Sequence, residues 1–234
     1  MSKGKVIKYE FKRLLLSKGY LLLLAATLAY CVALLQSIVM FGVDFTAPFS
    51  QWTFSAYCSS LTPFLYSLLL LLCARQLNPS ERKAEAIINA TPTQLQVVQI
   101  MRYGAIAGAF LIAVIVPIIS CFMFYRVVFD YTDVGILFLL GMLQLLAPAI
   151  LLFGIVMLVG RQKATAAYIM LAIILTISIF QIPIPAVFDF SRDATVYDNL
   201  LTPAFIVQQV VCATVGVVCI VISIYLSMKK PRID

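Results

Sequence analysis

Residues 103–125 read YGAIAGAFLIAVIVPIISCFMFY, and no charged residue interrupts them. A helix of about 20 apolar residues crosses the roughly 30 Å of hydrocarbon in a lipid bilayer. Backbone N–H and C=O groups find no water at that depth, so the stretch has to satisfy them internally as a helix. These residues therefore predict a membrane-spanning helix.

The rest of the chain has the same character. Of its 234 residues, 63% are hydrophobic and 12% are charged, whereas soluble domains contain about half apolar and a quarter charged residues. We expect an all-α membrane protein with six transmembrane helices in one domain, residues 1–234, and no nucleotide-binding domain. The predicted spans are Tyr20–Val43, Thr53–Ala74, Val97–Tyr125, Val134–Val159, Ala164–Ile182 and Ala204–Met228.

The charges predict the orientation of these spans. The formal net charge is +7, and all 17 Lys and Arg residues except Arg126 and Arg192 fall on one side of the alternating spans. Cytoplasmic loops carry the excess of Lys and Arg, so both termini are predicted to be cytoplasmic in a cell membrane, which we expect to be prokaryotic. Topology explains the positive charge, so we expect membrane lipid and no nucleic acid as a partner.

The N-terminal stretch is amphipathic. One face holds Ile7, Phe11, Leu14 and Leu15, and another holds Lys5, Lys8 and Lys12. This spacing predicts a helix within residues 1–19 that lies in the headgroup layer. The alternative is a basic flank on the first span.

The cytoplasmic connection after the second span, residues 75–96, has two helix-start signals. Asn78 is a suitable N-cap, Pro79 suits the first helical position, and Glu81 can close a capping box. The segment Thr91–Gln94 repeats this arrangement before the third span. The pattern predicts a short, separate helix that docks on a cytoplasmic partner; the alternative is a solvated connector.

An acidic–basic pair in a short cytoplasmic helix, followed by Thr91-Pro92 and a third span, resembles the permease subunits of ABC-2 type transporters. The resemblance implies that this segment is the coupling helix, which fits a cleft on a separate ATP-binding subunit. The N-terminal helix resembles the elbow helix of that family. The external link 183–203 resembles its re-entrant helices, so we expect a folded link; the alternative is a flexible loop with aromatic anchors at the interface. The residues implied in coupling are Asn78, Glu81, Arg82, Lys83, Glu85, Ile87 and Ile88.

Missing motifs limit the chemistry of this chain. No G-x-x-x-x-G-K-[ST] motif occurs, so a P-loop ATPase with ATP-Mg has to be another polypeptide. The chain has no histidine, which excludes histidine-ligated metal and haem sites. We expect no cofactor, no metal and no enzymatic activity in this chain. No Asp, Glu or Lys lies mid-span, and Arg102 and Arg126 lie near span ends, where they can snorkel to water.

The spans contain uncharged polar residues. In the resembled family, spans two and five line a route between two permeases, identical or paralogous, and here that implies Ser59, Ser60, Thr62, Tyr66, Thr176, Ser178 and Gln181. The alternative for each is a hydrogen bond between helices. Such a neutral route suits an amphipathic peptide, antibiotic or lipid-like cargo.

Two further interpretations stay open at this stage. The chain could be a non-transport scaffold or sensor subunit, or an ion-coupled carrier, although ion-coupled carriers commonly keep an ionisable group near the bilayer midplane. Small residues recur at Gly104 and Gly108 in the third span and at Ala25, Ala29 and Ala33 in the first. They predict close helix contacts, either within the chain or at a dimer seam.

Overall fold

The structure is a computed structural model. It describes residues 3–43, 46–78, 95–160 and 201–229, together with residues 165, 168–170 and 172–173. The described part of the chain is helical and contains no strand. Its elements are α1 (Lys3–Leu15), α2 (Lys18–Leu34), the π-helical segment η1 (Leu35–Val39), α3 (Gln51–Gln76), α5 (Leu95–Phe129), α6 (Gly135–Gly160) and α8 (Pro203–Lys229).

Five helical segments are long and apolar enough to cross a membrane. They are Lys18–Val39, Gln51–Gln76, Val97–Phe129, Gly135–Gly160 and Pro203–Leu226. These segments confirm five of the predicted apolar helices, with ends that differ by a few residues. The predicted span Ala164–Ile182 and link 183–203 lie mostly outside the described residues. The chain is a multi-span helical membrane protein.

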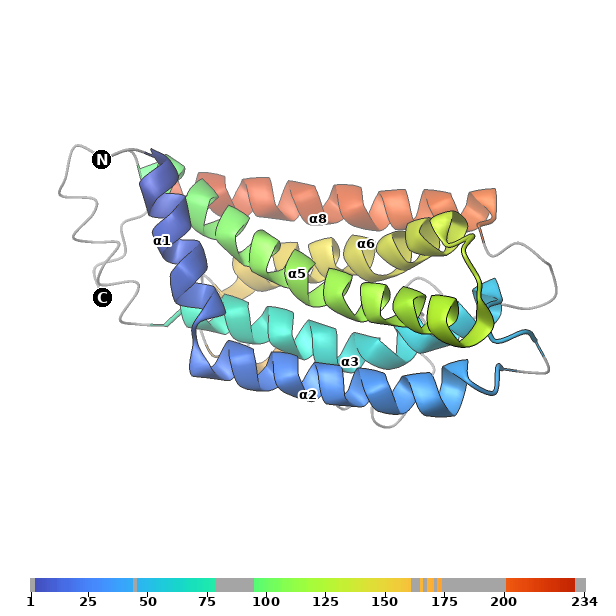
Figure 1. Ribbon diagram of the computed structural model, residues 1–234. Helices are drawn as coiled ribbons and strands as arrows, with labels where there is room; N and C mark the ends of the chain where they lie inside the picture. The colour runs from blue at the N-terminus through green and yellow to red at the C-terminus, as the bar shows by residue number, and fades with distance from the viewer. Residues whose placement is uncertain are drawn as a thin grey trace.

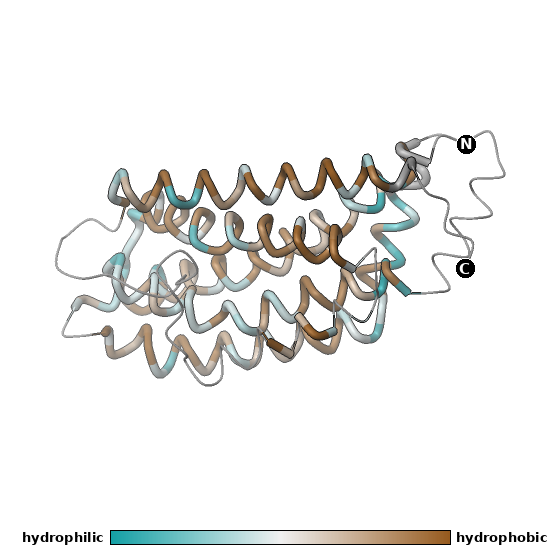
Figure 2. Tube along the Cα trace, turned by 180° about the vertical axis from the view of Figure 1, so that it is seen from behind, coloured by the Kyte–Doolittle hydropathy of each residue, from teal (hydrophilic) through white to brown (hydrophobic). Residues whose placement is uncertain are grey.

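The long helices run side by side, and α1 crosses one end of the bundle (Figure 1). Apolar residues dominate the length of the bundle in Figure 2, whereas hydrophilic residues gather along α1. Large apolar side chains also point outward, among them Leu22, Val32, Met123, Val211 and Val221. An apolar outer surface of this extent is suited to lipid rather than to water.

Helix α3 lies at the centre of the bundle and contacts α2, α5 and α6. Its side chains Phe54, Tyr57, Leu61 and Leu65 follow one another at helical spacing and are fully buried. Pro63 lies inside α3 without ending it, as Pro117 does in α5 and Pro148 in α6. Proline inside membrane helices is tolerated where neighbouring groups satisfy the backbone that it leaves unpaired.

Glycine permits a close helix contact between α6 and α8. A Cβ atom on Gly216 would lie 2.6 Å from the backbone carbonyl carbon of Ile150, and a Cβ on Gly154 would meet the carbonyl oxygen of Gly216. The two backbones therefore approach more closely than any side chain allows. This contact was not predicted from the sequence, because the two glycines belong to distant spans and neither forms a G-x-x-x-G pair.

The predicted Gly104–Gly108 motif is divided between two environments. A Cβ atom on Gly108 would lie 3.1 Å from the Phe11 ring of α1, whereas nothing lies within 4 Å of one on Gly104. Gly108 therefore serves a contact within the chain. Ala25, Ala29 and Ala33 lie on the exposed side of α2, so the contacts of that stripe within the described bundle are few.

Candidate functional site

A buried ion pair fastens α1 to α5 at the basic end of the bundle. A Glu10 carboxylate oxygen lies 3.4 Å from Nε of Arg102, and the other oxygen lies 2.9 Å from a guanidinium nitrogen of Arg13. Glu10 is 7% exposed and Arg102 is 5% exposed. The expectation that Arg102 snorkels to water is therefore wrong, because α1 covers it and supplies the compensating carboxylate.

Neighbouring contacts extend this junction along α5. The Phe11 ring packs on Gly108. The Tyr20 hydroxyl, at the start of α2, donates a 2.9 Å hydrogen bond to the Ala109 carbonyl oxygen. Ser17 caps α2 by accepting a hydrogen bond from the Tyr20 backbone N–H. The sequence of α1 predicted its apolar and basic faces correctly, since Leu14 is buried while Lys8 and Lys12 are exposed. The prediction did not include Glu10, which is hidden among the lysines.

The predicted coupling residues come before α5 in the chain. Asn78 is described and exposed, immediately after α3. The other six, Glu81, Arg82, Lys83, Glu85, Ile87 and Ile88, lie outside the described residues. Helix α5, which Glu10 joins to α1, begins at Leu95. It is therefore the helix that follows the predicted coupling segment in the chain.

The predicted pathway residues on α3 either form hydrogen bonds or are buried. Ser59 Oγ accepts a 2.9 Å bond from Gln144 Nε2 of α6. Ser60 and Thr62 donate to carbonyl oxygens one turn earlier in α3, at 2.9 and 3.2 Å. Tyr66 is 4% exposed, and its hydroxyl has no hydrogen-bond partner among the described residues. Thr176, Ser178 and Gln181 lie outside the described residues.

Gln144 places Ser59 at a contact between α3 and α6, where Ser59 is half-buried. Its amide also donates to the Ser55 carbonyl oxygen and accepts from the Ser55 hydroxyl, both at 3.2 Å. Three hydrogen bonds thus join α3 to α6. For Ser59 the structure supports the alternative of interhelical bonding. Ser60 and Thr62 remain half-buried on α3.

A second polar junction joins three helices near the basic end. The Tyr103 and Ser223 hydroxyls lie 3.1 Å apart, and Ser223 donates to the Met157 carbonyl oxygen at 3.2 Å. These residues belong to α5, α8 and α6. Neither residue was predicted as functional, because a tyrosine and a serine in separate apolar runs carry no signal of their pairing.

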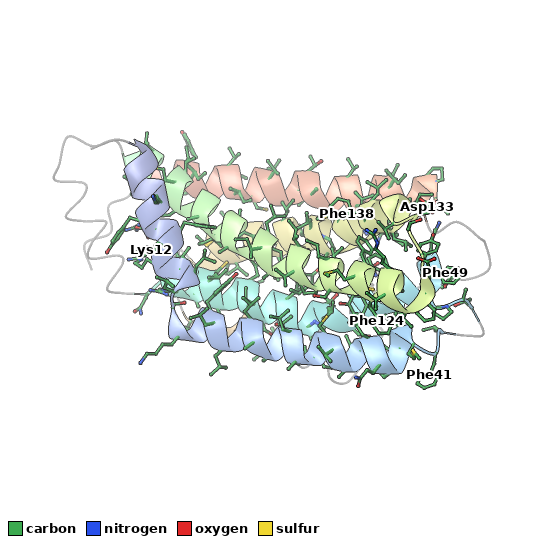
Figure 3. All side chains as sticks on the ribbon, in the orientation of Figure 1. Lys12, Phe41, Phe49, Phe124, Asp133 and Phe138 are labelled. Carbon is green, nitrogen blue, oxygen red and sulfur yellow. The ribbon has the colours of Figure 1, made fainter. Side chains whose placement is uncertain are left out.

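The opposite end of the bundle carries two adjoining pockets. One, of about 480 Å³, lies between the start of α3 and the loop from α5 to α6; it is lined by Thr46, Ala47, Phe49, Ser50, Gln51, Trp52, Tyr131, Asp133, Ile136 and Leu137. The other, of about 230 Å³, is lined by Ile119, Phe122, Met123, Arg126, Tyr131, Thr132 and Val134. Figure 3 shows Phe49 and Asp133 at the end of the bundle away from Lys12. Tyr131 lies between the two pockets.

Local backbone geometry shapes this end. Gly42 has a φ of 73°, and a Cβ there would meet the Thr46 carbonyl oxygen. Ser50 accepts a 3.2 Å hydrogen bond from the Thr53 backbone N–H and so caps α3. Asp130 ends α5 with a φ of 52°, a left-handed conformation that aspartate tolerates better than most residues. The two turns bring Phe49 and Tyr131 together.

Tyr131 is held by an aromatic stack and by its acidic neighbour. Its ring centroid lies 4.8 Å from that of Phe49, with the planes 17° apart. Burial raises the pKa of the Tyr131 phenol, and the nearby Asp133 carboxylate raises it further. The phenol therefore stays neutral at physiological pH, and Asp133 supplies the negative charge of the larger pocket.

Comparison of the chain with models of protein families, with curated proteins and with solved structures found no match. The described residues hold no group of three or more His, Cys, Asp or Glu side chains that could bind a metal. All six cysteines are free thiols.

Proposed function

We propose that this membrane protein is the transmembrane permease subunit of an ATP-driven ABC-2 type exporter. A separate P-loop ATPase would bind residues 78–90 on the cytoplasmic side, and a second permease, identical or paralogous, would complete the pathway. The chain would carry no catalytic residue of its own. The degenerate motif Glu81–Pro92 supports this assignment from the sequence.

The docking of α1 on α5 is the observation that carries the proposal. A helix that only lay on the lipid surface would need no buried carboxylate, yet Glu10 reaches into the bundle to Arg102. The contact fixes the first turns of α5, the helix that follows the predicted coupling segment. Movement of that segment would therefore move α1 and α5 together as one body. Coupling to a cytoplasmic ATPase requires such a linked movement.

Transport would follow from a difference in affinity between inward- and outward-open states. The half-buried Ser60 and Thr62 of α3, together with an apolar exterior, fit an amphipathic peptide, antibiotic or lipid-like cargo better than a small ion. Described charged side chains that lie within the spans are few, and Arg102 is already paired.

The test is to find whether a neighbouring reading frame encodes a P-loop ATPase without transmembrane segments, and to reconstitute the chain with it. Glu81→Ala, and Arg82→Ala combined with Lys83→Ala, are expected to leave insertion and thermal stability unchanged while ATPase binding falls at least about tenfold, because a buried charge loses its partner at the interface. The matched control is Asp130→Asn at the opposite end, which should bind the ATPase normally.

Different outcomes support different functions. Unchanged ATPase binding and unchanged transport in both variants would overturn the permease assignment. Transport that needs no ATPase and follows an ion gradient would identify an ion-coupled carrier. Absence of both transport and ATPase binding in the intact protein would leave the scaffold or sensor function.

A further inference from the structure

The larger pocket, opposite the α1 end, combines three aromatic side chains with one carboxylate. Phe49 and Trp52 come from the start of α3, while Tyr131 and Asp133 come from the loop between α5 and α6. No Lys or Arg side chain is among the described residues that line it. Its volume of about 480 Å³ falls within the roughly 300–1,000 Å³ typical of small-molecule sites.

The electrostatics of such a lining favour a cation. Aromatic faces are negative and attract an ammonium or guanidinium group whose centre lies within about 6 Å of the ring centroid. The stack of Phe49 on Tyr131 holds two of these rings in fixed positions. Among the described residues that line the pocket, Asp133 is the charged one, so it gives this lining a negative charge that disfavours anions.

The shape of the lining selects among cations. A bare metal ion needs several oxygen ligands, and Asp133 is the single carboxylate in the described lining. An alkylated ammonium gains cation–π attraction from aromatic rings, which a hydrated metal ion does not. Thr46, Ser50 and Gln51 supply neutral polar groups for the remainder of such a ligand.

We propose that this pocket binds an organic ammonium group, of the quaternary or alkylated type, against the Phe49, Trp52 and Tyr131 rings that line it and near the Asp133 carboxylate. The ammonium group belongs either to a soluble cation or to the headgroup of a membrane lipid, since the pocket lies at the end of the apolar bundle. The site does not depend on an ATPase, so the inference stands apart from the transport function proposed above.

Trp52 provides the test, because it is the only tryptophan in the chain. Choline chloride titrated into the purified protein in detergent should change Trp52 emission along a saturating curve, with sodium chloride used to match ionic strength. The neutral isostere 3,3-dimethylbutan-1-ol has the same shape without the charge, and it should give no saturating change. Equilibrium dialysis with radiolabelled choline supplies a second measurement that does not depend on fluorescence.

Matched variants separate binding from folding. Asp133→Asn should weaken choline binding about two- to fivefold, the range of an exposed ion pair, whereas Asp130→Asn in the same loop should leave it unchanged. Tyr131→Leu should weaken it about threefold or more, and Tyr131→Phe, which keeps the ring, should not. Thermal melting of each variant checks that the bundle is intact.

The source of the ammonium group is decided in nanodiscs. Phosphatidylcholine is mixed into phosphatidylglycerol nanodiscs, and choline binding is compared between the unmodified protein and Asp133→Asn. If phosphatidylcholine lowers choline binding only in the unmodified protein, the ammonium group belongs to a lipid headgroup. If choline binds equally with and without phosphatidylcholine, the ligand is a soluble cation. Absence of saturable choline binding in both detergent and pure phosphatidylglycerol nanodiscs would overturn the proposal, as would binding that Asp133→Asn and Tyr131→Leu both leave unchanged.

Discussion

At the scale of single residues, Glu10 shows how one carboxylate turns an amphipathic helix into part of the bundle. It is surrounded in the sequence by basic residues, and the periodicity of α1 depends on its apolar and lysine faces. A buried charge is stable only when paired and hydrogen-bonded. The Arg13 and Arg102 guanidinium groups provide that pairing from two helices.

Replacement of this carboxylate should therefore destabilise the protein. Glu10→Gln is expected to cost about 3–5 kcal/mol, the range for a buried ion pair that loses one partner, because the Arg102 charge would remain buried. Thermal unfolding in detergent measures the loss. Lys12→Gln, on the exposed side of the same helix, is the control and should change stability by less than about 0.5 kcal/mol. Equal melting temperatures for both variants would show that the Arg102 charge finds compensation elsewhere.

At the scale of helices, the contact between α6 and α8 depends on the absence of side chains at Gly154 and Gly216. Gly216→Ala should separate the two helices, because its Cβ would lie 2.6 Å from the Ile150 backbone. Overpacking of this kind costs about 1–3 kcal/mol. The expected result is a lower melting temperature together with increased amide exchange in α8.

Gly104→Ala is the matched control for this substitution. It adds the same methyl group to a membrane helix, but nothing lies within 4 Å of the new atom. The free energy of unfolding of Gly104→Ala should stay the same or rise by about 0.5–1 kcal/mol, since alanine favours helix more than glycine does. A loss of stability in Gly104→Ala equal to that in Gly216→Ala would mean that an added methyl group is unfavourable at both positions, and that the α6–α8 contact does not explain the loss at Gly216.

The positions of the helices could be predicted from the sequence, whereas the contacts between the helices could not. Apolar run length predicted α3 and α6 to within about three residues, because membrane thickness sets the length of a span whatever its neighbours are. Which helices touch depends on side chains from distant runs. Ser59 is one of the predicted pathway residues, a role that stays a prediction, and its hydroxyl bonds to Gln144, which is 85 positions away in the chain. No local pattern reports such a partner.

The outer pocket shows the same limit. Phe49 and Tyr131 flank separate helices, and neither belongs to a motif. The turns that precede them contain Gly42 and Asp130 in left-handed backbone conformations, which hydropathy does not report. The distribution of Lys and Arg predicted the side of the membrane for this end, but not a binding pocket.

At the scale of the whole molecule, the two ends of the bundle differ in charge. The α1 end holds Lys8, Lys12, Arg13 and Lys18, whereas the loop at the other end holds Asp130 and Asp133. Figure 3 shows Lys12 and Asp133 at these opposite ends. This separation of the described charges is the arrangement that the predicted orientation requires, and the cytoplasmic position of the α1 end stays a prediction from the preference of Lys and Arg for that side.

Cysteine labelling tests this orientation in intact cells. In a background where the six native cysteines are replaced, Thr132→Cys should react with a membrane-impermeant maleimide, because Thr132 is exposed at the acidic end. Lys12→Cys, exposed on α1, should react only after the membrane is permeabilised, since fifteen of the seventeen basic residues favour a cytoplasmic position for that end. Glu81→Cys and Lys163→Cys should behave like Lys12→Cys. Labelling of Lys12→Cys from outside, with protection of Thr132→Cys, would reverse the topology and would place the proposed coupling segment where no cytoplasmic ATPase can reach it.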